Sequence, residues 1–498
     1  MPGPTNTSRH FPHTAWAWPS GALDQLLCAA ICPDAATGRQ AFFDWLDCHD
    51  IDSAGFREHR LLASISERYG KDLAARPEHA RLVGLQRHLW TRSRMAMAEA
   101  LPVLRALADA GIAMLLLKGG ARIAAHAGDQ RARVAHDLDI LVPPDDFARA
   151  LDVLFDAGWN ASSGESRLCL KAQAGSLRAM NFFGQRFGDI DLHQWAYGAQ
   201  SPRQAALEAM LWQNARPAVF FGVPVRIPSP TDRLALAICH SGLDAHAHSD
   251  WLVDCAQLIG EGEIDGEALL AALGTMQAVV PAQVALGYLA QRLGVALPAP
   301  FLMRLLADRG AGPLRRLSDL LQAKPRSAWG VLSWLARGLA KQRRLALARK
   351  ARSAPVPLKG RFHAAGCAPV SATPSTNARL LDLSALGAGG LRFRLELLVT
   401  MPGPPRRLEF ELNTEMQHLK RLSLRSLRRR HGPTRLSFDG VIELPEGQFG
   451  LWLEARPGRH LRGTEPAAKA ARYGALAFTV LSFQCAPVSG APPLRNAG

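Results

Sequence analysis

The sequence predicts an α+β protein, with a mixed sheet and helices at its centre, helical regions on either side and a β-sandwich-like domain at the C-terminus. Continuous apolar runs at 112–117 and 138–142 are typical of strands that are buried on both faces. Apolar residues recur at helical spacing over 21–110 and again over 229–352. Over 379–498, apolar and polar residues alternate as they do in half-buried strands.

Shifts in composition divide the 498 residues into six segments. A chain of this length exceeds one ordinary hydrophobic core, so several domains are expected. In order, we predict a mobile N-terminus (1–20), a helical region (21–110), a mixed α/β core (111–228), a helical domain (229–352), a Pro- and Ser-rich linker (353–378) and a β-rich domain (379–498).

The elements of the core follow from local patterns. A long helix over about 77–109 should end at Gly111, a favoured residue after a helix. Thr231 is the expected N-cap of a later helix over 232–241. The other expected elements are strands at 112–117, 138–142, 168–171, 177–183 and 189–195, and helices at 121–126, 145–157 and 249–259.

The formal net charge of +16 favours an anionic partner, either a nucleotide, a nucleic acid, an acidic glycan or a membrane surface. The basic excess is concentrated in 337–361 and 406–435, where we expect contact with an anionic polymer or a membrane surface. A solvated basic face is the alternative. No apolar run reaches the roughly 20 residues that span a bilayer, and the N-terminus lacks a signal-peptide pattern. We therefore expect no transmembrane segment and a cytoplasmic location.

The eight cysteines are scattered. Cys28, Cys32 and the Cys48-His49 pair do not form a recognised zinc pattern, so we expect buried small apolar side chains.

Three carboxylates lie on strand-like runs. Asp137 and Asp139 are two residues apart and therefore point to the same side of a strand. Asp191 lies between Ile190 and Leu192 on a later run. Adjacent carboxylates repel each other until a proton or a cation relieves the repulsion, and Mg²⁺ prefers carboxylate and phosphate oxygens. We predict a two-ion Mg²⁺ site, one ion lowering the pKa of an acceptor hydroxyl and the other neutralising pyrophosphate.

Nearby residues extend this site. Lys118, Gly119 and Gly120 stand where a strand turns into a helix, which lets backbone N–H groups and a positive charge approach a phosphate. Arg133 can pair with a phosphate or with a carboxylate of the site. Asp189 is a reserve ligand, ranked lower because Gly188-Asp189 reads as a turn. Each motif taken alone is also compatible with an ordinary structural role, such as a turn or a salt bridge, but their combination in this order is uncommon.

Several histidines are also candidates. His193 shares a strand face with Asp191, so it is a candidate for contact with substrate or metal, or else a buried, hydrogen-bonded residue. Trp251 lines either a nucleotide pocket or the core. A further group resembles a metal site on paper, but its spacing favours structural or surface roles over zinc; its members are His240, His246, His248, Asp250 and Asp254.

Residues 112–195 resemble the nucleotidyltransferase superfamily with the DNA polymerase β-like fold, and most of all its bacterial uncharacterised nucleotidyltransferase family. The matching motifs are LLLKGG (115–120), RVAHDLDILV (133–142) and IDLHQW (190–195), with a similar helical region at 232–259. Many relatives carry a serine where this chain has Gly120, so the phosphate grip here would depend on backbone amides and Lys118.

This resemblance implies transfer of a nucleoside monophosphate (NMP) from an NTP, for which we expect ATP, to a hydroxyl of a small molecule, glycan or peptide. Asp137, Asp139 and Asp191 would bind Mg²⁺, which Mn²⁺ can replace, and Asp191 would orient or deprotonate the acceptor. Two alternatives stay open: a toxin-type nucleotidyltransferase that acts on RNA, and a non-catalytic scaffold that binds an anionic polymer. Three intact carboxylates argue against the scaffold.

Overall fold

The structure is a computed structural model, and its chain clusters into two compact units, Met1–Val142 with Phe187–Leu347 and Pro143–Arg186 with Ala348–Gly498. The structure describes residues 13–126, 131–162, 167, 170–171, 174–198, 201–242, 250–308, 312–325, 330–351, 363–364, 369–372, 376–383, 389–400, 407–415, 417–425, 434–444, 449–457 and 476–487.

The first unit begins with an ordered segment. Ala17 is fully buried at the end of a short 3-10 helix, and the rings of Trp18 and Tyr288 meet edge to face at 5.9 Å. The prediction of a mobile N-terminus is therefore wrong for 13–20, while 1–12 lie outside the described residues. The elements here are η1 (Thr14–Ala17), α1 (Ala22–Ile31), α2 (Ala35–Leu46), η2 (Ile51–Ser53) and α3 (Phe56–Tyr69).

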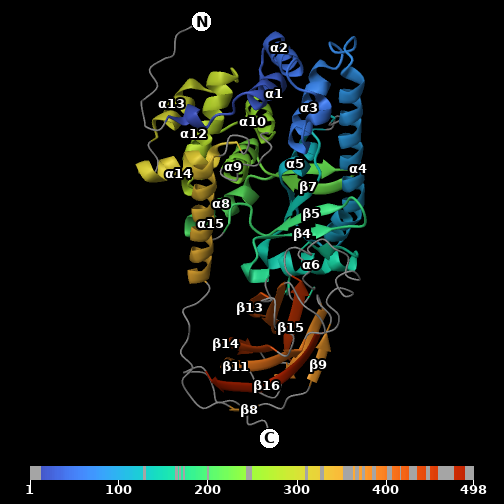
Figure 1. The fold of residues 1–498 in the computed structure, drawn as a ribbon, viewed down its shortest axis with the longest axis vertical. Helices are drawn as coiled ribbons and strands as arrows, with labels where there is room; N and C mark the ends of the chain where they lie inside the picture. The colour runs from blue at the N-terminus through green and yellow to red at the C-terminus, as the bar shows by residue number, and fades with distance from the viewer. Residues whose placement is uncertain are drawn as a thin grey trace. The chain divides into compact units, whose positions relative to one another are not determined.

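Helix α4 (His79–Asp109) is the predicted long helix, and Gly111 follows it with a φ of 68°. Such a backbone conformation is favoured by glycine and ends the helix. Figure 1 shows α4 running beside β5 and β7, which it contacts. The next strand, β1 (Leu115–Leu116), is shorter than the predicted 112–117: it begins three residues later, and α5 (Lys118–Ala125) begins two residues after its end.

A mixed seven-stranded sheet, in the order β3-β4-β5-β2-β1-β7-β6, confirms the predicted α+β class. β2 pairs in parallel with β5 and antiparallel with β1, and β1 pairs in parallel with β7. Its other strands are β2 (Leu138–Leu141), β3 (Asn160–Ala161), β4 (Ala179–Phe183), β5 (Asp189–His193), β6 (Arg216–Phe220) and β7 (Val223–Ile227).

The β6–β7 hairpin was not predicted. Phe221 and Gly222 connect its strands, and both have positive φ, 46° and 82°. This is the geometry of a two-residue hairpin turn, which is ordinarily signalled by Asn-Gly or Asp-Gly. Because phenylalanine occupies the first turn position, the sequence lacks the dipeptide pattern by which such a hairpin is usually predicted.

The predicted strand at 168–171 is also wrong for residues 170 and 171, which are helical, as is residue 167; residues 168 and 169 lie outside the described residues. The alternating Leu-Cys-Leu sequence imitates a strand. Arg167 Nε and Lys171 Nζ instead both reach Asp152 of α6 (Phe147–Asp156), at 2.6 and 2.7 Å. A spacing of four places them on the same side of a helix. The neighbouring short helices are η3 (Pro144–Asp146) and η4 (Ala174–Ser176).

Helices return after the hairpin, as predicted. Ser229, not Thr231, caps α9, because its Oγ accepts a hydrogen bond from the Asp232 N–H and Pro230 opens the helix. Thr231 Oγ1 accepts from the backbone N–H of Asp265. The helices are α8 (Pro202–Gln213), α9 (Pro230–Ser241), α10 (Trp251–Gly260), α11 (Gly266–Thr275), α12 (Val279–Gly287), η5 (Tyr288–Arg292), α13 (Ala299–Ala307), α14 (Pro313–Ala323) and α15 (Val331–Ala351).

One large apolar core joins the helices of this unit to β1 and β2. Cys28 and Cys32 are buried in it, which confirms the apolar interpretation of these two cysteines. Trp251 packs against the same core. Among the described residues, no helix is long and apolar enough to cross a membrane.

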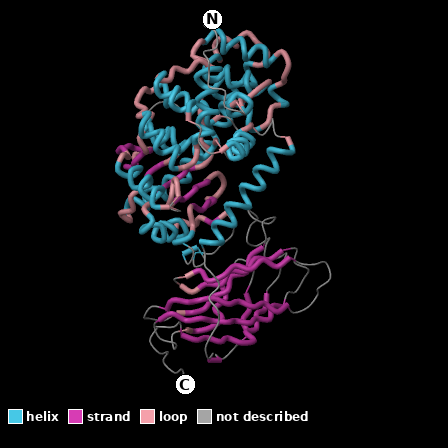
Figure 2. The backbone as a smooth tube through the Cα atoms, turned by 90° about the vertical axis from the view of Figure 1, so that its left-hand side faces the viewer, coloured by secondary structure: helices cyan, strands magenta, loops and turns pink. Residues whose placement is uncertain are grey.

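The C-terminal strands form two antiparallel sheets, in the orders β10-β15-β12-β13 and β14-β11-β16-β8, with β9 also on β16 (Figure 2). They share one core, which includes Phe393, Phe410 and Phe438. The predicted linker over 353–378 is wrong where it overlaps β8, β9 and the start of β10. The strands are β8 (His363–Ala364), β9 (Pro369–Ala372), β10 (Thr376–Asp382), β11 (Gly389–Thr400), β12 (Arg407–Asn413), β13 (His418–Arg425), β14 (Thr434–Leu444), β15 (Gly450–Pro457) and β16 (Leu476–Pro487).

Candidate active site

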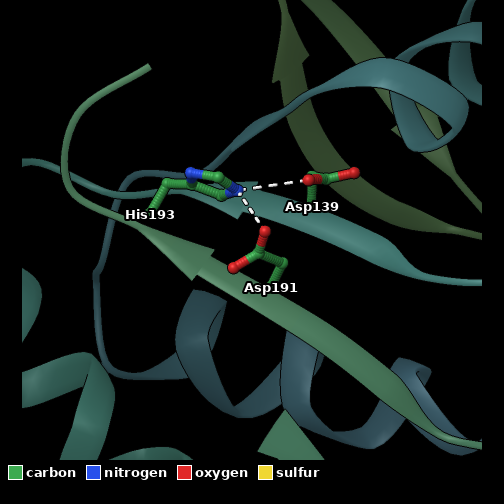
Figure 3. Close-up of side chains that lie close together, drawn as sticks. All are labelled: Asp139, Asp191 and His193. Atoms are coloured by element: carbon green, nitrogen blue, oxygen red, sulfur yellow. Dashed lines mark hydrogen bonds and ion pairs between the residues drawn. The ribbon is translucent and has the colours of Figure 1, made fainter. Parts of the chain in front are cut away.

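Two parallel strands bring the central side chains together. Asp139 of β2 and Asp191 of β5 are register partners, and His193 follows on the same face of β5. One side-chain ligand atom from each residue lies within 4.8 Å of the others. Figure 3 shows the three side chains pointing toward one another. Asp191 and His193, which the sequence placed on one strand face, thus lie beside Asp139. Asp137, the other carboxylate predicted on the earlier strand, is not a member of this cluster.

The imidazole of His193 bridges the two carboxylates. Its Nε2 lies 3.1 Å from Asp139 Oδ1 and 2.9 Å from Asp191 Oδ2 (Figure 3). Burial alone would lower the pKa of His193, but the hydrogen bonds to Asp139 and Asp191 raise it. When it is protonated, the imidazole offsets part of the negative charge of the pair.

Lys118 supplies the second positive charge. Its Nζ lies 2.5 Å from Asp139 Oδ1, and its side chain is 34% exposed. Burial would raise the pKa of Asp139, but the charge of Lys118 and the hydrogen bond from His193 lower it below its usual range. Burial likewise opposes the charged form of Lys118, while Asp139 raises the pKa of the ammonium group. Both groups are therefore ionised near neutral pH.

The turn that carries Lys118 is held in an unusual conformation. Lys118 has a φ of 44°, which is uncommon for a residue other than glycine. The N–H of Leu117 donates to the backbone oxygen of Asp139 at 3.0 Å, so the turn is tied to β2 beside the carboxylate. Strain of this kind persists where the surrounding structure fixes it, often at functional sites.

The two glycines after Lys118 allow close packing. A Cβ on Gly119 would lie 2.6 Å from the Cβ of Ala135, and one on Gly120 would lie 2.8 Å from Leu138 Cδ1. Helix α5 therefore approaches the segment before β2 more closely at Gly119 than a side chain permits, and a side chain at Gly120 would have to displace the buried Leu138 of β2. This contact gives a physical reason for the absence of serine at position 120.

Replacing Gly120 with Ser is accordingly expected to destabilise the protein by about 1–3 kcal/mol, because the added atoms overpack a tight contact. Urea unfolding measures the effect. Gly84→Ser is the matched control, since an added Cβ there meets nothing within 4 Å. Equal unfolding midpoints for the two variants would contradict the packing explanation.

Asp137 and Asp189 flank the central group. Asp137 precedes β2, and burial, with the charge of Asp139, raises its pKa. Asp189 is the first residue of β5 rather than part of a turn, which corrects the reason for ranking it lower. Burial and the nearby charges of Asp137, Asp191 and Asp139 raise the pKa of Asp189 to about 6. The side chains of Asp137 and Asp189 therefore lie close enough to Asp139 and Asp191 to interact with them electrostatically.

Arg133 binds carboxylates of α10. Its Nε and Nη2 contact Asp254 at 2.9 and 2.8 Å, and its Nη1 lies 2.6 Å from Asp250 Oδ2. Burial opposes the charge of Arg133, but Asp250 and Asp254 raise its pKa. Asp250 and Asp254, two members of the group that resembled a metal site, therefore pair with Arg133, in agreement with the structural role predicted for them. His246 and His248 lie outside the described residues.

The sequence did not identify two other participants. Arg60 of α3 places Nε 2.6 Å from Asp250 Oδ2, and Glu99 of α4 accepts hydrogen bonds from the N–H groups of Phe187 and Gly188. Glu99 thereby fixes the chain where it enters β5. Both residues come from helices far from the motifs in sequence, and no local spacing marks them.

The site suits a divalent cation. Asp139 Oδ2, Asp191 Oδ1 and Asp189 Oδ1 are buried without a hydrogen-bond partner among the described residues. Buried carboxylate oxygens in this state are costly, and a hard cation such as Mg²⁺ or Mn²⁺ takes oxygen ligands of this type. The residues present therefore fit a divalent metal ion.

Comparisons with known proteins agree with the sequence prediction. Residues 56–294 match a family model described as "Uncharacterised nucleotidyltransferase". The chain is also similar to the solution structure of the antibiotic-resistance factor ANT(2'')-Ia, with 12% identity and a TM-score of 0.25 over 40% of this chain and 94% of that one. No curated protein matches. Residues 56–294, the part of this chain that matches the family model, contain every site residue described above.

Proposed function

We propose that this chain, whose residues 56–294 match the uncharacterised nucleotidyltransferase family model, moves an NMP from ATP to a hydroxyl of a small molecule, glycan or peptide at the Asp139–Asp191–His193 cluster. The observation that carries the proposal is the ionised Asp139 next to Asp191, with Lys118 in contact. Paired carboxylates with a cationic neighbour are what a metal-assisted phosphoryl centre requires.

We propose Mg²⁺ as the metal, with Mn²⁺ as a substitute, and Asp137, Asp139 and Asp191 as the residues that hold a two-ion site. The orphaned oxygens of Asp139 and Asp191 support this assignment. A metal bound there would neutralise phosphate charge and lower the pKa of the acceptor hydroxyl.

The protein's own groups have separate tasks in this proposal. Lys118 and the backbone N–H groups of Gly119 and Gly120, at the start of α5, bind the triphosphate. Asp191 orients or deprotonates the acceptor, and His193 positions both carboxylates through its hydrogen bonds and can also contact substrate. The contacts of Arg133 support a positioning role on the nucleotide side.

Lys118→Met is expected to raise the KM for the NTP by about 10- to 100-fold, because a hydrogen bond to a charged group contributes roughly 1.5–3 kcal/mol. Steady-state kinetics at varied NTP concentration measures this. Lys71→Met removes an exposed lysine of the same unit and is the control. An unchanged KM in the Lys118 variant would remove this residue from the triphosphate site.

The reaction itself is tested with NTPs labelled at the α-phosphate, supplied with Mg²⁺ and clarified cell extract as the source of acceptors. We expect label on an acceptor and release of unlabelled pyrophosphate. Label transferred only from the γ-position would assign a kinase-type reaction instead. No transfer from any NTP, with NTP binding unchanged in Asp139 variants, would overturn the proposal.

We also propose a contact with an anionic polymer or a membrane surface through 337–361 and 406–435, and a cytoplasmic location, where NTP is supplied. The charge of +16 supports this contact. Salt-sensitive binding to RNA or an acidic glycan that ignores Asp139 and Asp191 variants, without NMP transfer, would favour the scaffold alternative. Growth arrest on expression that is lost with Asp139→Asn would favour the toxin alternative.

A further inference from the structure

Helix α15 presents large apolar side chains to solvent. Val331, Leu332, Trp334, Leu335 and Leu339 are between 56% and 75% exposed. At about 100° per residue, these five positions fall within an arc of about 160° on one side of the helix.

The opposite side of α15 faces inward. Ser333, which lies diametrically opposite the centre of the apolar arc, is only 1% exposed. An ordinary surface helix buries its apolar stripe and exposes its polar one. Here the two are exchanged, so the apolar arc is not explained by packing of the unit to which α15 belongs. Isolated exposed leucines are normal, but a contiguous group marks an interaction site.

The charge of the helix indicates what the apolar arc meets. Within Val331–Ala351 the sequence contains no acidic residue. It contains six basic ones, which follow the first apolar turns: Arg337, Lys341, Arg343, Arg344, Arg349 and Lys350. An exposed apolar arc in a helix that carries six basic residues and no acidic one favours an anionic surface with an apolar layer beneath it, which a bilayer of anionic phospholipid provides.

We propose that α15 binds the surface of an anionic phospholipid bilayer, with Leu335 and Leu339 inserted among the acyl chains and the positive charge of the helix attracted to the anionic headgroups. The six basic residues exclude a spanning role, because charges at the bilayer centre are costly. A nucleic acid is less suitable, since valine and leucine offer nothing to phosphates. The proposal sharpens the anionic contact proposed above and does not depend on NMP transfer.

The test is co-sedimentation of the full chain with vesicles of phosphatidylcholine, alone or with about one-third phosphatidylglycerol. We expect at least about tenfold stronger partitioning onto the anionic vesicles, and a loss of about tenfold or more in the Leu335→Ser/Leu339→Ser variant. The control variant Met303→Ser/Leu314→Ser removes exposed apolar residues of α13 and α14, which are 65% and 85% exposed, and should bind like the wild type.

Four results would overturn the proposal. The first is a wild type that stays in the supernatant in the presence of anionic vesicles. The second is a double variant that binds the vesicles as strongly as the wild type, which would mean that charge alone causes the binding. Light scattering that shows a wild-type dimer and a monomeric double variant, without vesicle binding, would assign the arc to a second copy of the chain. Sedimentation with single-stranded RNA but not with vesicles would assign a nucleic acid. NMP transfer without vesicles is expected to be unchanged in the double variant, so failure here is distinct from failure of the proposed function.

Discussion

Asp139→Asn is expected to lower the rate of NMP transfer by about 10³-fold or more. The substitution keeps the shape of the side chain but removes the charge that Lys118 and His193 neutralise. Loss of a buried carboxylate that holds a metal removes several kcal/mol of transition-state stabilisation, and each 1.36 kcal/mol is about tenfold in rate. Transfer of α-phosphate label at saturating NTP and Mg²⁺ measures the effect.

The matched control for this prediction is Asp109→Asn, an exposed aspartate at the end of α4. It changes the same charge in the same unit without touching the site and should retain wild-type activity. Circular dichroism and unfolding curves establish that the Asp139 variant is folded. Transfer by the folded Asp139 variant within tenfold of wild type would show that the carboxylate is not part of the reaction.

Arg133→Leu is expected to destabilise the protein by about 3–5 kcal/mol. The substitution removes the guanidinium that contacts both Asp250 and Asp254, and losing one partner of a buried ion pair is costly even though Arg60 still contacts Asp250 and Arg122 lies 3.6 Å from Asp254. The side chains of Arg133 and Asp250 are only 9% and 5% exposed, so water replaces little of the lost interaction. Chemical unfolding followed by circular dichroism measures the change in the free energy of unfolding.

An exposed ion pair provides the comparison. Arg216 contacts Glu263, and both side chains are more than half exposed, so Arg216→Leu should change the stability by no more than about 1 kcal/mol. An Arg133 variant as stable as the Arg216 variant, with a raised KM for NTP, would mean that Arg133 acts directly on the nucleotide. That result would restore the phosphate contact that the sequence suggested.

Much of the site could be predicted because its residues are local features of strands. Asp139 and Asp191 lie in apolar runs, and the i, i+2 rule placed His193 beside Asp191. The register of β2 against β5, which sets Asp139 opposite Asp191, depends on the packing of the whole sheet. Arg60 and Glu99 depend on how α3 and α4 pack, and no short-range pattern encodes that.

The fold shows the same division. Long periodic segments such as α4 and the alternating C-terminal strands were predicted, because each repeats its signal over several turns or pairs. Short elements were missed when their residues carried a different signal. The β6–β7 hairpin turns on Phe221-Gly222, and β8 and β9 are short strands of four residues or fewer in a Pro- and Ser-rich stretch.

Binding of a non-hydrolysable ATP analogue tests the central claim most directly, because it requires no knowledge of the acceptor. Isothermal titration calorimetry would compare the wild type with the Asp139→Asn/Asp191→Asn variant, each with Mg²⁺ and with EDTA. If Asp139 and Asp191 form a metal–nucleotide site, the wild type should bind the analogue in a Mg²⁺-dependent manner, and the variant should lose that dependence. Equal, Mg²⁺-dependent binding by both proteins would contradict it.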